Sequence, residues 1–343
     1  GYLKRSTIKS YNSSVDKYKT PEMKQGDAVV CISEAWTTDT ILCFTDAGNF
    51  IPVPVYKLEE NKWKDRGGHI NALITLPSDE KIIKVIISSK LRKDIFAIFL
   101  SKKGQIKRTP LDEFERASRN RPTKCMRLNN DDELVDVKLS TGDANVIVFS
   151  EQGNFTMFNE NDLLPLSTKA SGVKAMANFK NQKAVGLYVV QKDEHDKIVL
   201  ITDKGCERIF DTNKAILTPR LGKVQNAFPC FKSDVHKLVK VLKAVQNEEQ
   251  GMDVILYNQE IEPIEHTIID FRPTDLFKYA KRNIEGVSAK TRIKLVFTYE
   301  TELVNESLIS QPVIIKKSET NLHNKDELLD EDLTINEEEN ALN

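Results

Sequence analysis

The side chains of this sequence with the clearest chemical capability are clustered Lys and Arg residues. Between Lys102 and Arg127 the chain has nine basic and three acidic residues, a local net charge of +6. Five of the nine are Arg, whose planar guanidinium can hold a phosphate through two parallel hydrogen bonds. This concentration of positive charge favours binding to a polyanion, since phosphates neutralised by Lys and Arg release their condensed counterions. A single Lys or Arg outside such a cluster is more often part of a solvated face.

Catalytic and metal-binding motifs are absent from the sequence. It contains no phosphate-cradling GxxxxGK[ST], no HExxH and no GxSxG. The five cysteines are scattered without a CxxC pair, and the five histidines are isolated. We therefore expect no metal site, no disulfide framework and a reducing compartment. No apolar run approaches the roughly 18 residues of a transmembrane helix, and the first residues lack the apolar core of a signal peptide.

The charge of the chain is divided unevenly. The whole sequence has a formal net charge of -1, but residues 318–343 contain nine acidic residues and one basic residue. That segment therefore carries -8, and residues 1–317 carry +7. The segment has no aromatic residue, so we expect a disordered acidic tail. It either keeps the protein soluble or competes with a polyanion for the basic body, and deletion of 318–343 without an affinity change at low salt would exclude competition.

The basic body is a repeat with a period of about 50 residues. Each copy has an apolar run ending in Thr or Ser, two polar residues, a Gly and a second strand-like run. Four copies carry this Gly at positions 48, 104, 153 and 205, and the opening GYLKRST places Gly1 in the same register. A sixth copy, DVILYNQEIEPIE, has Ile261 at the Gly position. We expect Ile261 to reject the positive φ that Gly adopts freely, so that the sixth turn differs.

Each copy predicts a β-hairpin followed by a further strand, because the runs are short and rich in Ile, Val and Phe. The further strands are expected at Asp27–Ile32, Lys81–Ile87, Glu133–Leu139, Lys183–Val189 and His236–Leu242. Six such units would form a closed ring of blades that protects its sheet edges. Helix signals are weak, and the best is Asp275–Arg282, which could equally be a bent strand.

The repeat resembles the C-terminal domain of the A subunit of bacterial type IIA topoisomerases, the family of the gyrase A subunit, and the likeness is strongest to topoisomerase IV. The resemblance covers about residues 1–300 and rests on GYLKR, the recurring [TS]-x-x-G hairpins, and the loops Lys64–His69 and Ser171–Lys174. It implies an all-β fold, a six-bladed β-pinwheel whose rim binds and bends duplex DNA. The domains are then 1–300 for the pinwheel, 301–317 for a linker and 318–343 for the disordered acidic tail.

Two departures from the family pattern are visible. The gyrase A subunit has a QRRGGKG box in its first blade, whereas residues 13–26 here read SSVDKYKTPEMKQG. The missing box favours topoisomerase IV over gyrase. An apolar strand before Gly1 is also missing. We therefore expect the chain to be a fragment, and whether its ring of blades closes stays an open question.

The resemblance also implies the functional setting. The domain would be non-catalytic and without a cofactor of its own, and it would present the transported duplex for decatenation and relaxation. The parent would be an ATP-hydrolysing, Mg²⁺-dependent type II topoisomerase with an A2B2 arrangement, in which the domain's partners are the ATPase B subunit and the catalytic core of its own A subunit. The parent would act in chromosome segregation in the bacterial cytoplasm, associated with the chromosome; peripheral membrane association stays open.

Candidate DNA contacts follow the hairpin Gly or lie in the loops beyond it. We expect phosphate contacts from Lys4, Arg5, Lys64, Arg66, Lys102, Lys103, Lys107, Arg108, Arg116, Arg119, Arg121, Lys124, Arg127, Lys169, Lys174, Arg208, Arg220 and Lys223. The third copy would be the main anchor, and no metal ligand or catalytic residue is expected.

Three other interpretations stay open from the residues. The chain could be a gyrase A domain with a degenerate box, which supercoiling by its holoenzyme would reveal. It could be a propeller that serves as a protein-interaction platform, although it has no WD dipeptide per blade. A propeller enzyme would need acids or His lining a channel, and the sequence does not supply them.

Overall fold

A computed structural model describes residues 1–14, 21–115, 121–177, 179, 181–246, 251–288 and 291–298. All of these lie in one compact unit, Gly1–Gln311. The predicted linker and acidic tail lie outside the described residues, as do Arg116 and Arg119.

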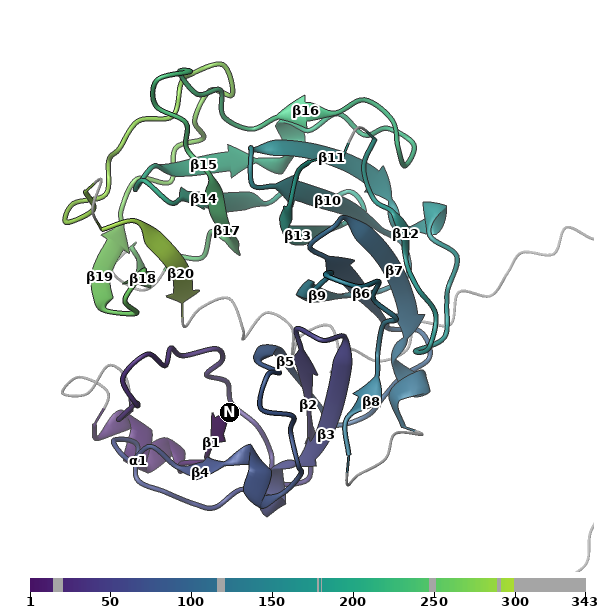
Figure 1. Ribbon diagram of the computed structural model, residues 1–343, viewed down its shortest axis with the longest axis vertical. Helices are drawn as coiled ribbons and strands as arrows, with labels where there is room; N and C mark the ends of the chain where they lie inside the picture. The colour runs from purple at the N-terminus through teal and green to yellow at the C-terminus, as the bar shows by residue number, and fades with distance from the viewer. Residues whose placement is uncertain are drawn as a thin grey trace, which may run out of the picture. The chain divides into compact units, whose positions relative to one another are not determined.

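The described residues form an all-β fold with five blades, which follow one another in chain order (Figure 1). Each blade is an antiparallel sheet built on one hairpin. The first blade contains β2 (Thr40–Thr45), β3 (Asn49–Pro54), β5 (Ile82–Ser88) and β8 (Thr123–Lys124). The second contains β6 (Phe96–Ser101), β7 (Gln105–Pro110), β9 (Leu134–Ser140) and β12 (Val173–Lys174). The third contains β10 (Ala144–Ser150), β11 (Asn154–Asn159), β13 (Ala184–Gln191) and β16 (Gln225–Asn226). The fourth blade contains β14 (Lys197–Thr202), β15 (Glu207–Asp211) and β17 (Leu238–Lys243). The fifth contains β18 (Met252–Asn258), β19 (Pro263–Ile268) and β20 (Ile293–Thr298).

Short elements complete the described chain. The first sequence copy contributes β1 (Tyr2–Leu3), which pairs with β4 (Gly68–His69) in a two-stranded sheet. The helical turns are α1 (Ile8–Asn12), η1 (Val55–Lys57), η2 (Ile70–Ala72), η3 (Leu111–Phe114), η4 (Glu160–Asp162) and η5 (Thr212–Lys214). The predicted helix or bent strand at 275–282 is wrong: the segment has neither. The sequence predicts six blades, and five are found among the described residues.

Neighbouring blades exchange strands. In each four-stranded blade the innermost strand follows the hairpin of the same blade in the sequence. The outermost strand comes later in the chain, after the hairpin of the next blade, as when β8 pairs with β3 and β12 with β7. The predicted further strands appear as β5, β9, β13 and β17, and successive members of this series contact one another. The prediction for Asp27–Ile32 is wrong, since the structure has no strand there.

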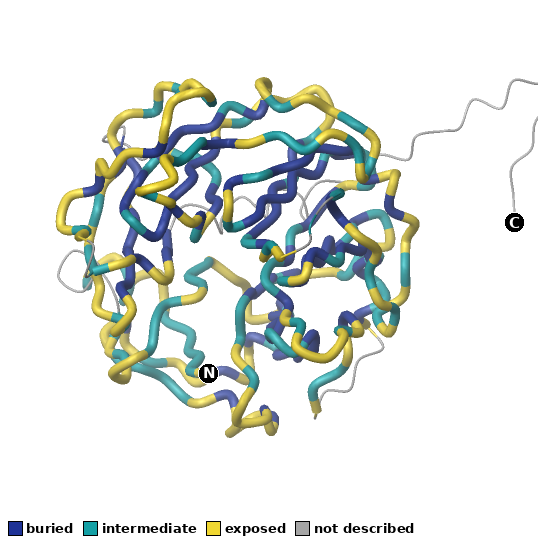
Figure 2. Tube along the Cα trace, turned by 45° about the horizontal axis from the view of Figure 1, so that its top comes forward, coloured by how far each residue is buried: buried dark blue, intermediate teal, exposed yellow. Residues whose placement is uncertain are grey.

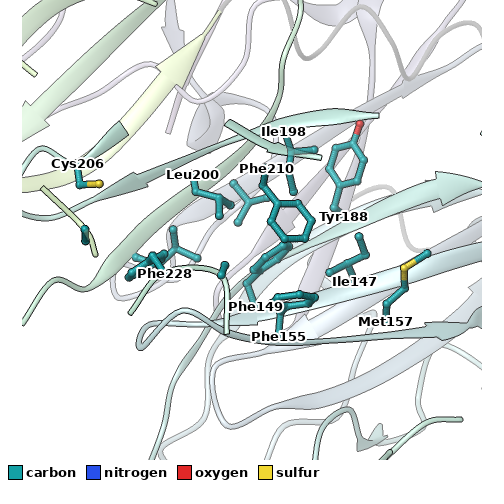
Figure 3. Close-up of a cluster of buried hydrophobic side chains, with 14 of the residues drawn as sticks. Ile147, Phe149, Phe155, Met157, Tyr188, Ile198, Leu200, Cys206, Phe210 and Phe228 are labelled. Atoms are coloured by element: carbon teal, nitrogen blue, oxygen red, sulfur yellow. The ribbon is translucent and has the colours of Figure 1, made fainter. Parts of the chain in front are cut away.

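Hydrophobic side chains from two adjacent blades share each inter-blade core. Phe149 and Phe155 of the third blade pack edge-on against Phe210 of the fourth, with ring centroids 5.8 and 5.1 Å apart (Figure 3). The burial pattern follows the strands, whereas the loops between them are largely exposed (Figure 2). These aromatic rings are therefore core residues, in line with the strand pattern, and they are not available to stack on bases.

The hairpin turns are alike in all five blades. Gly48, Gly104, Gly153 and Gly205 have φ between 71° and 77°, and Ile261 has φ of 62°. The expectation that the last turn must differ is therefore wrong. The Ile261 N–H donates to Asn258 O at 3.1 Å, as the Gly48 N–H does to Thr45 O. The paired strands impose this conformation on a β-branched residue, at a cost of about 1–3 kcal/mol.

The segment 28–32 connects the last blade to the first. Val29 lies against Tyr257 of β18, and its N–H donates to Tyr257 Oη at 3.5 Å. Cys31 packs instead into the core of the first blade. The last and first blades are thereby linked through non-strand chain.

Candidate nucleic-acid interface

A loop of ten residues recurs along the outer edge of the blades, and we call it the edge loop. Its last residue donates its N–H to the carbonyl of a hairpin Gly (Gly1, Gly104, Gly153 or Gly205), and its first residue donates to the carbonyl four residues after that Gly. Four edge loops have both anchors: 61–70, 166–175, 218–227 and 274–283. A fifth, 116–125, is described from residue 121 and has the same final anchor, Cys125 N–H to Gly48 O at 2.9 Å.

The equal length and equal anchors put the edge loops in one common register. The outermost strands β4, β8, β12 and β16 all occupy positions eight and nine of their loops. Seven of the predicted contacts fall at only three positions: Lys64 and Lys169 at position four, Arg66, Arg121 and Lys223 at position six, and Lys124 and Lys174 at position nine. All seven are exposed or partly exposed. The fold therefore repeats the same basic positions from blade to blade.

Hydrogen bonds join three consecutive edge loops to one another. The Arg127 N–H, just beyond the second loop, donates to Ala170 O of the third at 3.1 Å. Arg220 of the fourth loop donates from Nη1 to Lys174 O of the third at 2.6 Å. Arg121, Lys124, Arg127, Lys169, Lys174 and Lys223 are exposed on this connected surface, which we call the basic edge. A surface of exposed Lys and Arg side chains of this kind can neutralise phosphates of a nucleic acid backbone.

Three predicted contacts are buried and do not belong to the interface. The exposed fractions of Lys107, Arg108 and Arg208 are 1%, 7% and 3%. Lys107 Nζ donates to Ser167 O at 2.8 Å and Thr168 O at 3.1 Å, within the third edge loop. Arg208 donates to Ala227 O and to Lys278 O, both at 2.7 Å. Lys107 and Arg208 support edge loops from below, because loop carbonyls satisfy donors that would be costly to leave unpaired in the interior. Arg108 instead donates to Glu160 and Asn161 of the turn η4.

The first copy repeats this arrangement. Lys4, at the same position after the hairpin Gly as Lys107, donates to the carbonyls of Lys62, Trp63 and Asp65 in the first edge loop. Its ammonium also lies over the Trp63 ring, 5.0 Å from the centroid. Lys4 is thus engaged within the protein, although it is only partly buried.

The remaining predicted contacts have partners near the surface. Arg5 pairs with Glu60 at 2.9 Å and donates to Leu58 O. Lys102 pairs with Glu133 at 2.8 Å, and Lys103 Nζ donates to Asn130 O. Exposed pairs of this kind are weak, so they leave these bases able to exchange partners.

Sequence reasoning missed the basic residues of the last edge loop. Lys278, Lys281 and Arg282 are exposed there, in the motif KYAKR, whose pattern predicts a helix or strand instead. Counting ten residues back from Asn283, whose N–H is anchored to Gly205 O, identifies this loop. That register is visible only once the hydrogen bonds are known.

Burial lowers the pKa of the Lys107 ammonium from 10.5 to about 8. The folded protein therefore releases this proton before the unfolded chain does, and stability should rise with pH between about 8 and 10.5. We expect wild type to gain ~1–3 kcal/mol over this window relative to Lys107→Met. Urea unfolding of both proteins at pH 7.5 and pH 10.5 measures the gain, and a constant difference between them would contradict it.

Metal-binding clusters and membrane-spanning helices are not found in the described part of the chain. It contains no group of three or more His, Cys, Asp or Glu residues arranged to hold a metal ion. Among these residues no helix is long and apolar enough to cross a membrane.

Comparisons with known proteins agree with the repeat. A family described as DNA gyrase C-terminal domain, beta-propeller, matches residues 39–89, 96–141 and 144–191. The A subunit of DNA topoisomerase 4 from Staphylococcus aureus (strain MSSA476) is 30% identical over 265 residues, 74% of this chain and 32% of the relative. The corresponding protein from Bacillus subtilis (strain 168) is 28% identical over 239 residues, 70% of this chain and 29% of the relative. The chain thus spans about a third of the length of these relatives.

Solved structures show the same architecture. A crystal structure of the C-terminal domain of DNA topoisomerase IV superposes with a TM-score of 0.74 and 25% identity, covering 90% of this chain and 93% of that one. A DNA gyrase A C-terminal domain superposes with a TM-score of 0.61 over 82% of this chain and 94% of that one, and its 13% identity supports the fold alone.

Proposed function

This chain belongs to the family of the C-terminal domains of DNA gyrase and topoisomerase IV A subunits, a non-catalytic region of type II topoisomerases, and we propose that it binds and bends duplex DNA along its edge loops. The observation that carries the proposal is the basic edge. Five of its six bases lie at positions four, six or nine of loops that share one geometry and are hydrogen-bonded to one another, and Arg127 lies two residues beyond its loop. A regular row of cations on a rigid edge suits a backbone with regular phosphates and little sequence reading.

The DNA path follows from where the exposed bases lie. It runs over the edge loops 61–70, 166–175 and 218–227 and over residues 121–127, which are its densest part. Because the loops belong to successive blades, a duplex that touches several of them must curve, and the extra phosphate contacts offset the cost of bending.

We also infer that the two-stranded sheet β1–β4 is the sixth unit of a six-bladed pinwheel. Its edge loop has both anchors of the others, Ile70 N–H to Gly1 O at 2.7 Å and Asn61 N–H to Arg5 O at 3.0 Å. The link through 28–32 from the last blade to the first supports the same closure.

In the parent enzyme we propose the role of topoisomerase IV rather than gyrase, since the QRRGGKG box is missing from residues 13–26. The domain would present the transported duplex for decatenation and relaxation. Its partners would be duplex DNA, an ATPase B subunit and the catalytic core of its own A subunit, with ATP and Mg²⁺ bound elsewhere. The enzyme would act on the chromosome in a bacterial cytoplasm.

Titration of an approximately 40-bp duplex by fluorescence anisotropy across a salt series tests the DNA-binding proposal. We expect the logarithm of the binding constant to fall linearly with the logarithm of salt, with a slope of about -0.9 per phosphate neutralised. Several contacts are expected from the six exposed bases of the basic edge. Absence of binding at low salt would overturn the proposal.

A further inference from the structure

The last edge loop carries aromatic residues at two positions where several of the other loops carry bases. Phe277 occupies position four, which is Lys64 in the first loop and Lys169 in the third. Tyr279 occupies position six, which holds Arg66, Arg121 or Lys223 in three other loops. The common register puts both rings on the same edge as the predicted phosphate contacts.

The backbone of this loop is held firmly beneath the rings. The Lys278 carbonyl accepts from the buried Arg208 guanidinium at 2.7 Å, and the Ala280 N–H donates to Pro229 O at 2.9 Å. The Phe277 N–H donates to Asp275 Oδ1 at 3.0 Å. Phe277 therefore lies on a segment fixed on both sides, and its position does not depend on a free loop end.

Tyr279 forms part of a rigid aromatic stack. Its ring lies face to face with that of Phe231, with centroids 4.1 Å apart and planes inclined by 9°. The stack is itself about half exposed, at 46% for Tyr279 and 49% for Phe231, whereas Phe277 is 88% exposed. Three exposed aromatic rings on two anchored segments form an apolar patch, and such a patch indicates a surface that a partner covers.

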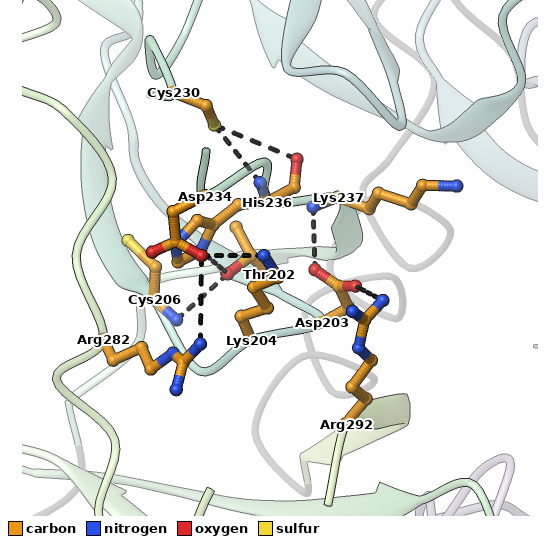
Figure 4. A network of polar contacts seen from close by, with 10 residues as sticks. All are labelled: Thr202, Asp203, Lys204, Cys206, Cys230, Asp234, His236, Lys237, Arg282 and Arg292. Atoms are coloured by element: carbon orange, nitrogen blue, oxygen red, sulfur yellow. Dashed lines mark hydrogen bonds and ion pairs between the residues drawn. The ribbon is translucent and has the colours of Figure 1, made fainter. Parts of the chain in front are cut away.

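The charges around these rings favour a polyanion as the covering partner. Lys232, Lys278, Lys281 and Arg282 are exposed on the two segments that carry the rings. The acids of the same segments are engaged: Asp234 bonds to Lys204 at 2.7 Å and lies 3.8 Å from Arg282 (Figure 4), and Asp275 accepts from the Phe277 N–H. Aromatic rings set among available cations suit nucleic acid better than an apolar protein groove.

We propose that Phe277 is a wedge that inserts between base pairs of the bound duplex and kinks it, on the same edge loop as Tyr279 of the Tyr279–Phe231 stack. This inference rests on the proposed DNA binding and adds the place and chemistry of the bend. Apolar side chains that open a base step bend a duplex sharply, and the larger protein surface that the bent duplex covers offsets the lost stacking. The wedge would act at the last edge loop, 274–283, whereas the first edge loop, 61–70, lies at the other end of the path.

A pair of labelled duplexes tests the wedge with the full chain. One is intact and the other has a central nick beside a 2-aminopurine, whose fluorescence rises when the base is unstacked. We expect the wild type to prefer the nicked duplex, because less stacking is lost there, and to raise the 2-aminopurine signal. Phe277→Ala should abolish both the signal and the preference and should weaken binding to the nicked duplex about tenfold.

Two further variants separate the wedge from other effects. Phe277→Lys restores the base that other loops have at position four, so it should keep affinity for intact DNA and steepen the salt slope by about one unit while losing the fluorescence signal. Ile269→Ala, an equally exposed apolar change just beyond β19, is the matched control and should behave as wild type.

The outcomes distinguish this inference from the function on which it rests. If no protein binds either duplex at low salt, the proposed function itself fails. If wild type binds but gives no 2-aminopurine signal, or Phe277→Ala keeps the signal, the wedge is overturned and DNA binding stands. If Phe277→Ala leaves DNA binding unchanged and weakens association with the rest of the A subunit, the aromatic surface is a protein contact and the wedge is again overturned.

Discussion

Reversal of charge on the basic edge is expected to remove most duplex binding. The variant Arg121→Glu, Lys124→Glu and Arg127→Glu replaces three exposed cations at the densest part of the path with anions. Three phosphate contacts are lost and three repulsions are added, so the affinity at low salt should fall by about a hundredfold or more. The magnitude of the salt slope should fall by about three units, which anisotropy titration with the approximately 40-bp duplex measures directly.

A matched control separates position from net charge. The variant Lys93→Glu, Lys183→Glu and Lys197→Glu changes the total charge equally, and all three residues are exposed outside the edge loops. We expect it to lower the affinity only slightly, through the long-range field that salt screens. Equal losses in both triple variants would mean that the protein attracts DNA through its overall charge, and the edge-loop path would be wrong.

Loss of the buried Arg108 guanidinium is expected to be the most destabilising single change. Arg108 Nη1 lies 3.3 Å from Glu160 Oε2, and the Glu160 side chain is fully buried. Glu160 also accepts from Ser140 Oγ at 2.6 Å and from the Ala144 N–H at 2.7 Å. Arg108→Met leaves a buried carboxylate without its cation, which typically costs about 3–5 kcal/mol. Urea unfolding at pH 7 measures the loss.

A second variant identifies the cause of that loss. The double variant Arg108→Met, Glu160→Gln should lose less than the sum of the single variants, because the two side chains act as a pair. Additive losses would assign the effect to packing over Phe96, whose ring centroid lies 4.9 Å from the guanidinium.

The contrast between Arg108 and Arg121 illustrates how two bases from one cluster acquire different roles. Both lie in the window 102–127, and the sequence treats them alike. In the fold Arg108 lies in β7 and its guanidinium contacts Glu160 of the turn η4. Arg121 lies in an edge loop in contact with solvent. Charge density along the chain therefore predicts a polyanion-binding region better than it predicts which bases do the binding.

Local patterns in the sequence were sufficient for the repeat, the hairpins and four of the further strands. Short β-branched runs, period-two alternation and a turn Gly act within a few residues, and such local preferences persist in the folded protein. The exposure of the candidate contacts at positions 64, 66, 121, 124, 127, 169, 174 and 223 could be predicted, because a loop rich in Lys and Arg has little alternative to solvent, and their contact with DNA stays a prediction.

Tertiary structure alone decided the rest, because the deciding contacts join residues far apart in the chain. Lys107 is held by carbonyls of Ser167 and Thr168, some sixty residues later, and the two anchors of each edge loop also lie on distant strands. The pairing of the complete strands β18 and β19 holds Ile261 at positive φ against its own preference. Strand exchange between blades thus determines which bases support the loops from below and which remain exposed to bind a partner.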